Sequence, residues 1–162
     1  MIYWQSLFQT PCLRRFIPLA IMRIALGMFF FASGFNKVFV LESQSMMLET
    51  ITEAGIPFPT FMAPFVAGCE MLFGVLLVVG FLTRLSALVL MIISLVALVT
   101  VGLQHIPVNL NLLTWYSWMF YLPESAYIVI CLQLVVQGGG PMSVDLSIAQ
   151  RLVLKGRPYY QK

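Results

Sequence analysis

Charged residues are scarce in this chain. Only 9% of its 162 residues are Asp, Glu, Lys or Arg, whereas 60% are hydrophobic. In soluble globular domains roughly a quarter of all residues are charged. This composition therefore excludes an ordinary soluble domain and is typical of an integral membrane protein. The net charge is +3, but outside the apolar runs the sequence has no basic patch interleaved with aromatic residues, which is the pattern of a nucleic-acid-binding surface. We therefore expect contact with the lipid bilayer and no nucleic-acid partner.

Residues that hold metals and redox cofactors are also few. His105 is the only histidine, and Cys12, Cys69 and Cys131 form neither a C-x-x-C motif nor a zinc-binding spacing. Haem and iron–sulfur clusters depend on such ligands. We therefore predict no metal site, no firmly bound cofactor and no autonomous oxidoreductase, and we expect the cysteines to act as small buried hydrophobic side chains.

Four apolar segments are long enough to cross a bilayer, which takes about 20 residues per helix. They lie at about 16–40, 61–82, 85–103 and 119–138. The connections are short, so we expect one membrane domain over residues 1–162. The predicted fold class is an all-α polytopic membrane protein, a four-transmembrane-helix bundle with a short C-terminal amphipathic helix. A cleavable signal peptide is the less favoured interpretation of the first segment, because its apolar run is longer than that of a usual signal.

The distribution of cations predicts the orientation. If the four helices alternate in direction, Lys37 lies alone at one side of the membrane. The other cations fall at the opposite side: Arg14, Arg15, Arg23, Arg84, Arg151, Lys155, Arg157 and Lys162. Because lysine and arginine are enriched on the cytoplasmic side, both termini are predicted to be cytoplasmic.

Three segments outside the spans have their own patterns. Residues 41–55 predict a short amphipathic helix that ends near Gly55. The strip 104–121 is rich in Trp and Tyr and is interpreted as an interfacial aromatic belt. After the fourth span, glycines end the helix, and Ser143 is predicted to cap a short amphipathic helix with Asp145 in its first turn.

The first two spans each have one stripe of small and polar residues at helical spacing. On the first span the stripe consists of Arg23, Gly27, Phe30, Gly34 and Lys37, and on the second of Ala63, Ala67, Glu70, Gly74 and Leu77. Small residues let membrane helices approach closely, and buried charges are kept away from lipid. We therefore expect the two stripes to face each other, with Asn36 and Glu124 at depths similar to that of the charged pair.

Two interpretations of Glu70 remain open. In the first, Lys37 and Glu70, with Asn36 and Glu124, form an intramembrane pocket that holds a quinone headgroup or passes a proton. In the second, which is slightly favoured, Lys37 and Glu70 form a satisfied ion pair that fixes the register of two helices.

The cations at the cytoplasmic side have a simpler interpretation. Arg23 and Arg84 are interpreted as anchors at the inner surface, and a tie from either to Asp145 would lock the turn after the fourth span.

Four blocks of the sequence together resemble the DoxX family of small four-helix membrane proteins. They are RIALGMFFFASGFNKVF (23–39), GIPFP (55–59), EMLFGVLLVVGFLTR (70–84) and GGGPMSVD (138–145). The motif residues that match are Arg23, Gly27, Gly34, Lys37, Glu70, Gly74, Gly80, Arg84, Gly138, Gly140, Ser143 and Asp145. One position departs from the pattern, because Met142 stands where family members commonly have an aromatic residue.

The resemblance implies a role but not a reaction. It suggests the membrane subunit of a redox-associated system linked to quinone or thiol chemistry, in a bacterial plasma (inner) membrane. The alternative is a non-catalytic membrane anchor or small-solute carrier, including a membrane partner in the handling of copper-binding peptides. Either role implies a partner protein or a homo-oligomer, and quinone is the candidate exchangeable ligand.

Overall fold

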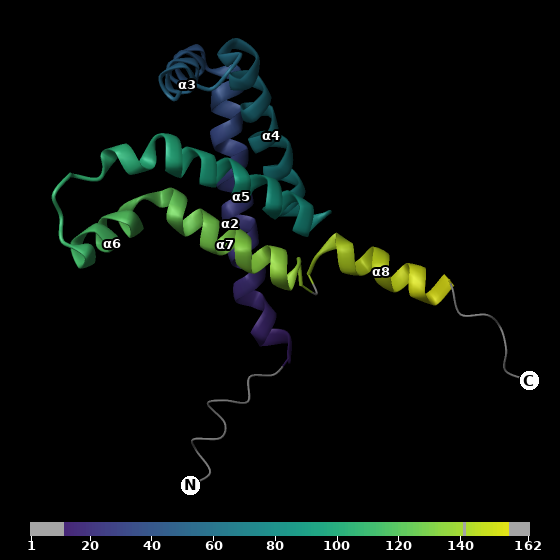
Figure 1. The fold of residues 1–162 in the computed structure, drawn as a ribbon. Helices are drawn as coiled ribbons and strands as arrows, with labels where there is room; N and C mark the ends of the chain where they lie inside the picture. The colour runs from purple at the N-terminus through teal and green to yellow at the C-terminus, as the bar shows by residue number, and fades with distance from the viewer. Residues whose placement is uncertain (1–11, 141, 156–162) are drawn as a thin grey trace, which may run out of the picture.

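The computed structural model describes residues 12–140 and 142–155, and every regular element in that part of the chain is a helix (Figure 1). The elements are α2 (Cys12–Phe39), α3 (Leu41–Glu53), α4 (Pro59–Val79), α5 (Thr83–Thr100), the 3-10 helix η1 (Gly102–His105), α6 (Leu112–Tyr121), α7 (Pro123–Gln137) and α8 (Val144–Lys155). The predicted all-α fold is confirmed. The side chains of Arg14, Arg15, Arg151 and Lys155, and the whole of Arg157 and Lys162, lie outside the described part, so the clustering of these cations stays a prediction.

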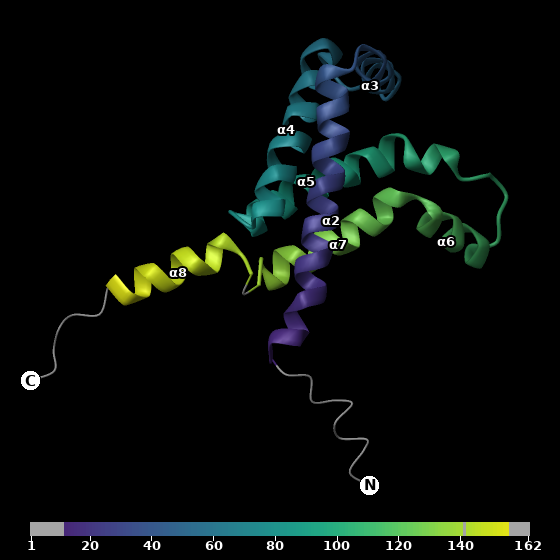
Figure 2. The same cartoon turned by 180° about the vertical axis from the view of Figure 1, so that it is seen from behind.

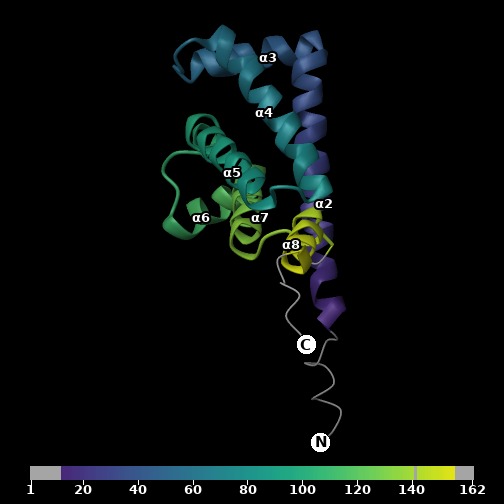
Figure 3. The ribbon, with the colours of Figure 1, turned by 90° about the vertical axis from the view of Figure 1, so that its right-hand side faces the viewer.

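The long helices form two antiparallel pairs. In the first pair α2 and α4 lie side by side, and in the second pair α5 and α7 do so. Figures 1 and 3 show that the second pair runs across the first instead of parallel to it. A buried cluster that includes Leu26, Phe30, Leu77, Leu90 and Leu134 joins the two pairs, so the core combines side chains from four helices.

Glycines set the distance between α2 and α4. A Cβ atom added to Gly34 would lie 2.5 Å from the Met71 nitrogen, and one added to Gly74 would lie 2.6 Å from the Phe31 nitrogen. Real side chains do not fit at such distances, so the two backbones touch at these glycines. Close approach through small residues is the usual way in which membrane helices associate. The facing stripes therefore form the contact between the first two spans.

In the described part of the chain, three helical segments are long and apolar enough to cross a membrane by themselves: Ile17–Phe39, Pro59–Val79 and Thr83–His105. The prediction of one continuous helix over the fourth span, 119–138, is wrong. The chain there bends by 75° between α6 and α7. Leu122 has an extended backbone, with φ −76° and ψ 125°, and Pro123 follows it. Proline disfavours helical geometry in the preceding residue and donates no hydrogen bond, which explains the break.

The two short amphipathic helices lie near opposite ends of the first pair (Figures 1 and 2). α3 packs on α2 and α4 at the end where α2 stops. It ends at Glu53, and Gly55 follows with a φ of +68°, close to the predicted end. α8 begins next to the turn between α4 and α5, where the Asp145 N–H donates to the Gly80 oxygen at 3.1 Å.

Candidate functional site

Lys37 and Glu70 form an ion pair between α2 and α4. The Lys37 Nζ donates to Glu70 Oε1 at 2.8 Å and to Oε2 at 2.7 Å. The Ser33 hydroxyl donates to Oε2 at 3.1 Å. Glu70 is only 4% exposed, whereas Lys37 is partly exposed. The carboxylate is therefore held by three hydrogen bonds, while the ammonium keeps one side open.

The helix geometry explains why these three side chains meet. Ser33 and Lys37 are four residues apart on α2 and so lie on one face, one turn from each other. Gly34 lies between them on the surface that touches α4, which brings the backbone of α4 close. Glu70 then reaches both side chains across the contact. Ser33 was not among the predicted pocket residues, although its spacing of four residues from Lys37 is a signal that points to it.

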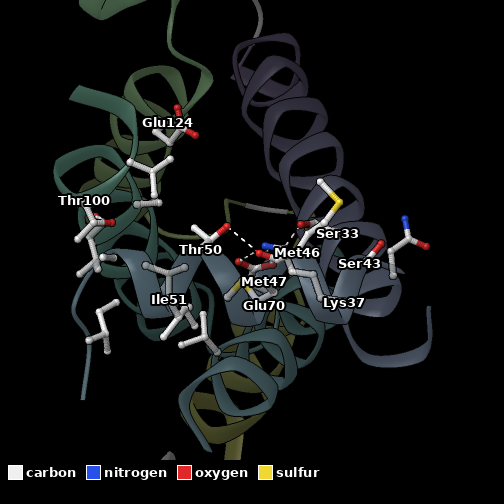
Figure 4. A pocket seen from close by; sticks show the side chains of 18 of the residues that line it. Ser33, Lys37, Ser43, Met46, Met47, Thr50, Ile51, Glu70, Thr100 and Glu124 are labelled. Atoms are coloured by element: carbon white, nitrogen blue, oxygen red, sulfur yellow. Dashed lines mark hydrogen bonds and ion pairs between the residues drawn. The ribbon is translucent and has the colours of Figure 1, made fainter. Parts of the chain in front are cut away.

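The ion pair forms part of the wall of a cavity of about 630 Å³. The polar side chains that line it are Ser33, Asn36, Lys37, Ser43, Thr50, Glu70, Thr100 and Glu124. The apolar ones come from α3, α4, α5 and the residues that follow α3 and α5: Met46, Met47, Ile51, Ala54, Ile56, Val66, Ile92, Ile93, Val96, Ala97 and Val101. Figure 4 shows Ser33, Lys37 and Glu70 close together at one side of this space, with Thr50, Met46 and Met47 of α3 beside them.

All four predicted pocket residues line this cavity, but they do not form one cluster. Lys37 and Glu70 are in direct contact, and Asn36 is the neighbour of Lys37 on α2. Glu124 lies apart from the ion pair in Figure 4, on the first turn of α7. Its Oε2 is buried and has no hydrogen-bond partner among the described residues. The site therefore has two carboxylates on different walls. That of Glu70 is paired with Lys37, whereas one oxygen of Glu124 has no hydrogen-bond partner among the described residues.

The wall formed by α3 was not expected. The residue pattern predicts an amphipathic helix here but no role for it in a site. In the structure α3 contributes Ser43, Met46, Met47, Thr50 and Ile51 to the cavity. A period of 3.6 residues indicates that a helix has two faces but does not indicate whether the polar face meets water or a cavity. This role of α3 therefore had no signal in the residue pattern.

Arg23 lies in a second cluster, near the turn that joins α4 to α5. The interpretation of Arg23 as an anchor at the inner surface is wrong, because the residue is only 2% exposed. Its Nη1 donates to the Gly139 oxygen at 3.1 Å and its Nη2 to the Met142 oxygen at 3.0 Å. Arg23 therefore holds the turn after α7 through backbone carbonyl groups. Arg84, by contrast, is exposed, and its Nη2 lies 3.5 Å from the Val136 oxygen.

Asp145 ties the same turn to α5 and not to an arginine. Its Oδ1 accepts the Leu82 N–H at 2.7 Å, and its Oδ2 accepts the Thr83 N–H at 2.8 Å. The predicted tie to Arg23 or Arg84 is not among the ion pairs in residues 12–140 and 142–155. A carboxylate at this position satisfies free N–H groups and interacts favourably with the helix dipole of α5.

The remaining motif residues shape this turn. Gly80, Gly138 and Gly140 have φ values of +76°, +74° and +71°, which favour glycine. Ser143 directly precedes α8, donates to the Gly140 oxygen at 2.6 Å, and lies with its Oγ 3.4 Å from the Leu146 nitrogen. The motif residues thus divide between the α2–α4 contact, the ion pair and the turn after α7.

The thiols form no bond with each other and belong to no metal-binding group in the described residues. Cys131 is fully buried and Cys69 is partly buried, and both are free. In the part of the chain that the structure describes, no group of three or more His, Cys, Asp and Glu side chains is arranged to hold a metal ion.

Comparison with protein families identifies the chain. The family model described as DoxX matches residues 19–103, which is more than half of the sequence. The chain belongs to the DoxX family. The matched residues of this DoxX protein include Lys37, Glu70 and the whole of α3 and α5, whereas Glu124 and the turn at 138–145 lie beyond them. Neither the search of curated proteins nor the search of solved structures found a match.

Membership of this family agrees with the apolar helices. This DoxX protein is a multi-pass membrane protein whose exposed apolar side chains contact the lipid bilayer. The Lys37–Glu70 pair lies between two helices that are each long enough to cross a membrane.

Proposed function

We propose that this DoxX-family protein is the membrane subunit of a redox-associated system and that its cavity binds the headgroup of a quinone. The observation that carries the proposal is the Lys37–Glu70 pair on the wall of a largely apolar cavity. Ionisable side chains inside membrane spans are costly and mark functional sites by default. A site with a few polar groups on an otherwise apolar lining is also the usual form of a small-molecule site.

The hydrogen bonds suggest a different role for each member of the pair. A lysine ammonium group has three N–H donors, and two of them are directed to Glu70. The third can donate to a carbonyl oxygen of a ligand. Glu70 accepts hydrogen bonds from both Lys37 and Ser33, so it positions the ammonium group. Lys37 is then the residue that contacts the quinone.

Electron transfer in this proposal belongs to a partner protein. Lysine, glutamate and serine side chains bind and orient a quinone but do not carry electrons. A partner that docks on the membrane surface would oxidise or reduce the quinone bound next to Lys37. The membrane subunit would then hold the quinone and supply hydrogen bonds.

We also propose a bacterial inner membrane with both termini in the cytoplasm. Arg23 lies beside Gly80 in the turn between α4 and α5, and Arg84 lies in the first turn of α5, whereas Lys37 lies near the end of α2 that leads into α3. An excess of arginine and lysine at one end of the spans supports placing that end in the cytoplasm. The cavity would then open towards the outer side.

A second candidate is a non-catalytic membrane anchor or small-solute carrier, whose partner supplies any chemistry. The three hydrogen bonds to the Glu70 carboxylate favour this candidate. An ion pair whose hydrogen bonds are satisfied needs no ligand, and its whole role can be to fix the register of α2 against α4. In this candidate the loss of either charge lowers stability and changes no binding.

Quinone binding to the purified protein in lipid nanodiscs tests the proposal. We expect the wild type to bind a benzoquinone with a decyl tail, and we expect Lys37→Met and Glu70→Gln to weaken this binding by at least about tenfold. Glu49→Gln is the matched control, because Glu49 is exposed on α3 and does not line the cavity. Thermal unfolding of each variant separates loss of binding from loss of fold. A wild type that binds no quinone, with variants that only lose stability, would instead support the anchor.

A further inference from the structure

The charges around the cavity disfavour an anionic ligand. The charge of Lys37 is already compensated by Glu70, and Glu124 adds a further carboxylate. No other lysine or arginine is found among the described residues that line the cavity. A phosphate group would need additional cationic donors when it leaves water. A neutral carbonyl group needs only the third N–H of Lys37 and the nearby amide of Asn36.

The side of the cavity formed by α5 has a different character. α5 contributes Ile92, Ile93, Val96 and Ala97, and only Thr100 among its lining residues is polar. Aliphatic side chains of this kind match an alkyl or isoprenoid chain, because contact between them removes apolar surface from water without leaving a polar group unpaired. The cavity is therefore polar where α2 and α4 meet and apolar along α5.

The apolar wall continues to the outer surface of the protein. Ile92 is 52% exposed and Val96 is 44% exposed, although both line the cavity. α3 packs on α2 and α4, whereas α5 packs on α4 and α7, so α3 and α5 border the cavity from different sides. Figures 1 and 3 show α3 and α5 as separate layers. The apolar tail of a ligand whose headgroup is bound at Lys37 can leave the cavity between α3 and α5 and remain in contact with apolar side chains.

From these three observations we infer that the ligand is a neutral, carbonyl-bearing molecule dissolved in the membrane. Its headgroup accepts a hydrogen bond from Lys37, its apolar chain lies along α5 over Val96, and it enters from the lipid between α3 and α5. The inference rests on the proposed function, which identifies the headgroup as a quinone, and it adds the path of the chain. A diacylglycerol has the same chemistry, a neutral carbonyl group with an apolar chain.

Binding of ligands with and without a chain to the protein in phosphatidylcholine nanodiscs tests the path. The ligands are a benzoquinone with a decyl tail, the same benzoquinone without a tail, a diacylglycerol and decyl phosphate. Val96→Trp fills the apolar wall, and Val99→Trp is its control, because Val99 is 58% exposed on the same helix but does not line the cavity. Partition of a ligand into the bilayer is the same for both variants, so their comparison cancels it.

We expect Val96→Trp to weaken binding of the tailed quinone by about tenfold and to change binding of the tail-less quinone by less than about twofold. Val99→Trp is expected to match the wild type with both ligands, and decyl phosphate is expected to bind at least about tenfold more weakly than the tailed quinone. If Val96→Trp does not fold, Ile92→Trp replaces it, with Leu95→Trp as the control. Leu95 is exposed on α5 and does not line the cavity.

Each other outcome overturns a defined part of the inference. Equal binding of the tailed quinone by Val96→Trp and Val99→Trp excludes the path along α5, and the proposed function stands if Lys37→Met still weakens binding by at least about tenfold. Equal weakening of tailed and tail-less quinone by Val96→Trp also excludes the path. Tight binding of decyl phosphate excludes the neutral headgroup. If only the diacylglycerol binds, and Val96→Trp but not Val99→Trp weakens that binding, the path along α5 stands and the quinone is refuted as the ligand. A wild type that binds none of the ligands refutes both.

Discussion

The ammonium group of Lys37 lies within hydrogen-bond distance of both carboxylate oxygens of Glu70, and the two residues belong to different membrane helices. Glu70 is the more buried of the two. The pair is thus asymmetric. If Lys37 is substituted, the remaining Glu70 carboxylate is shielded from water, whereas if Glu70 is substituted, the remaining Lys37 ammonium group is partly exposed. The two single substitutions should therefore have unequal effects.

We expect Lys37→Met to lower the free energy of unfolding by about 1–3 kcal/mol, because it leaves the buried Glu70 carboxylate with Ser33 as its remaining partner. Glu70→Gln should cost less, because the Lys37 ammonium can turn towards water or lipid headgroups. The double variant should lose less stability than the sum of the two single losses. Chemical unfolding in detergent micelles measures all three changes. Strictly additive losses would show that the two side chains do not interact.

Gly34→Ala is expected to destabilise the contact between α2 and α4 by about 1–3 kcal/mol, because the new Cβ atom would lie 2.5 Å from the Met71 nitrogen. Gly68→Ala is the matched control on α4. A Cβ atom at Gly68 meets no other atom within 4 Å, so this variant should be neutral or slightly more stable. Thermal unfolding of both purified variants measures the difference. Equal melting temperatures would mean that the helices are not in contact at Gly34.

Asp145→Ala is expected to cost about 1 kcal/mol, because it removes the side chain that accepts the Leu82 and Thr83 N–H groups at the start of α5. Asp145→Asn should recover part of this loss, since an amide oxygen can still accept one of these bonds. Hydrogen exchange of the Leu82 and Thr83 amides gives a local readout. Unchanged protection of both amides in Asp145→Ala would contradict the capping role.

The proposed topology predicts which positions a membrane-impermeant thiol reagent can reach. In a background where Cys12, Cys69 and Cys131 are replaced by alanine, Glu49→Cys should be labelled in intact cells. Arg84→Cys should be labelled only after the membrane is permeabilised, because it lies at the predicted cytoplasmic side. The opposite pattern would reverse the topology and place the cavity towards the cytoplasm.

The contact between the first two spans was predictable because it depends on local spacing. Arg, Lys and Glu are rare in apolar runs, and their positions relative to glycine reveal which face of each helix is packed. Lys37 and Glu70 were found from that pattern alone. The break at Leu122 also had a local signal, since Pro123 follows it, but an average of hydropathy over 119–138 conceals a single proline.

The parts that could not be predicted depend on contacts between distant segments. Arg23 was expected at the surface because arginine is normally solvated near the end of a span. Its partner Gly139 is 116 positions later in the chain, and the carbonyl groups of a turn have no signature in side-chain identity. The wall formed by α3 is a similar case, because the position of α3 over the cavity depends on how the two helix pairs cross.

The attachment of Arg23 to the turn after α7 has a consequence for biosynthesis. The ribosome makes Arg23 long before Gly139 and Met142, so the guanidinium group has none of these carbonyl partners while the intervening helices are inserted. Until the turn is made, water, lipid headgroups or the insertion machinery must solvate this charge. A chain truncated before the turn would leave the Arg23 guanidinium group without these two carbonyl acceptors.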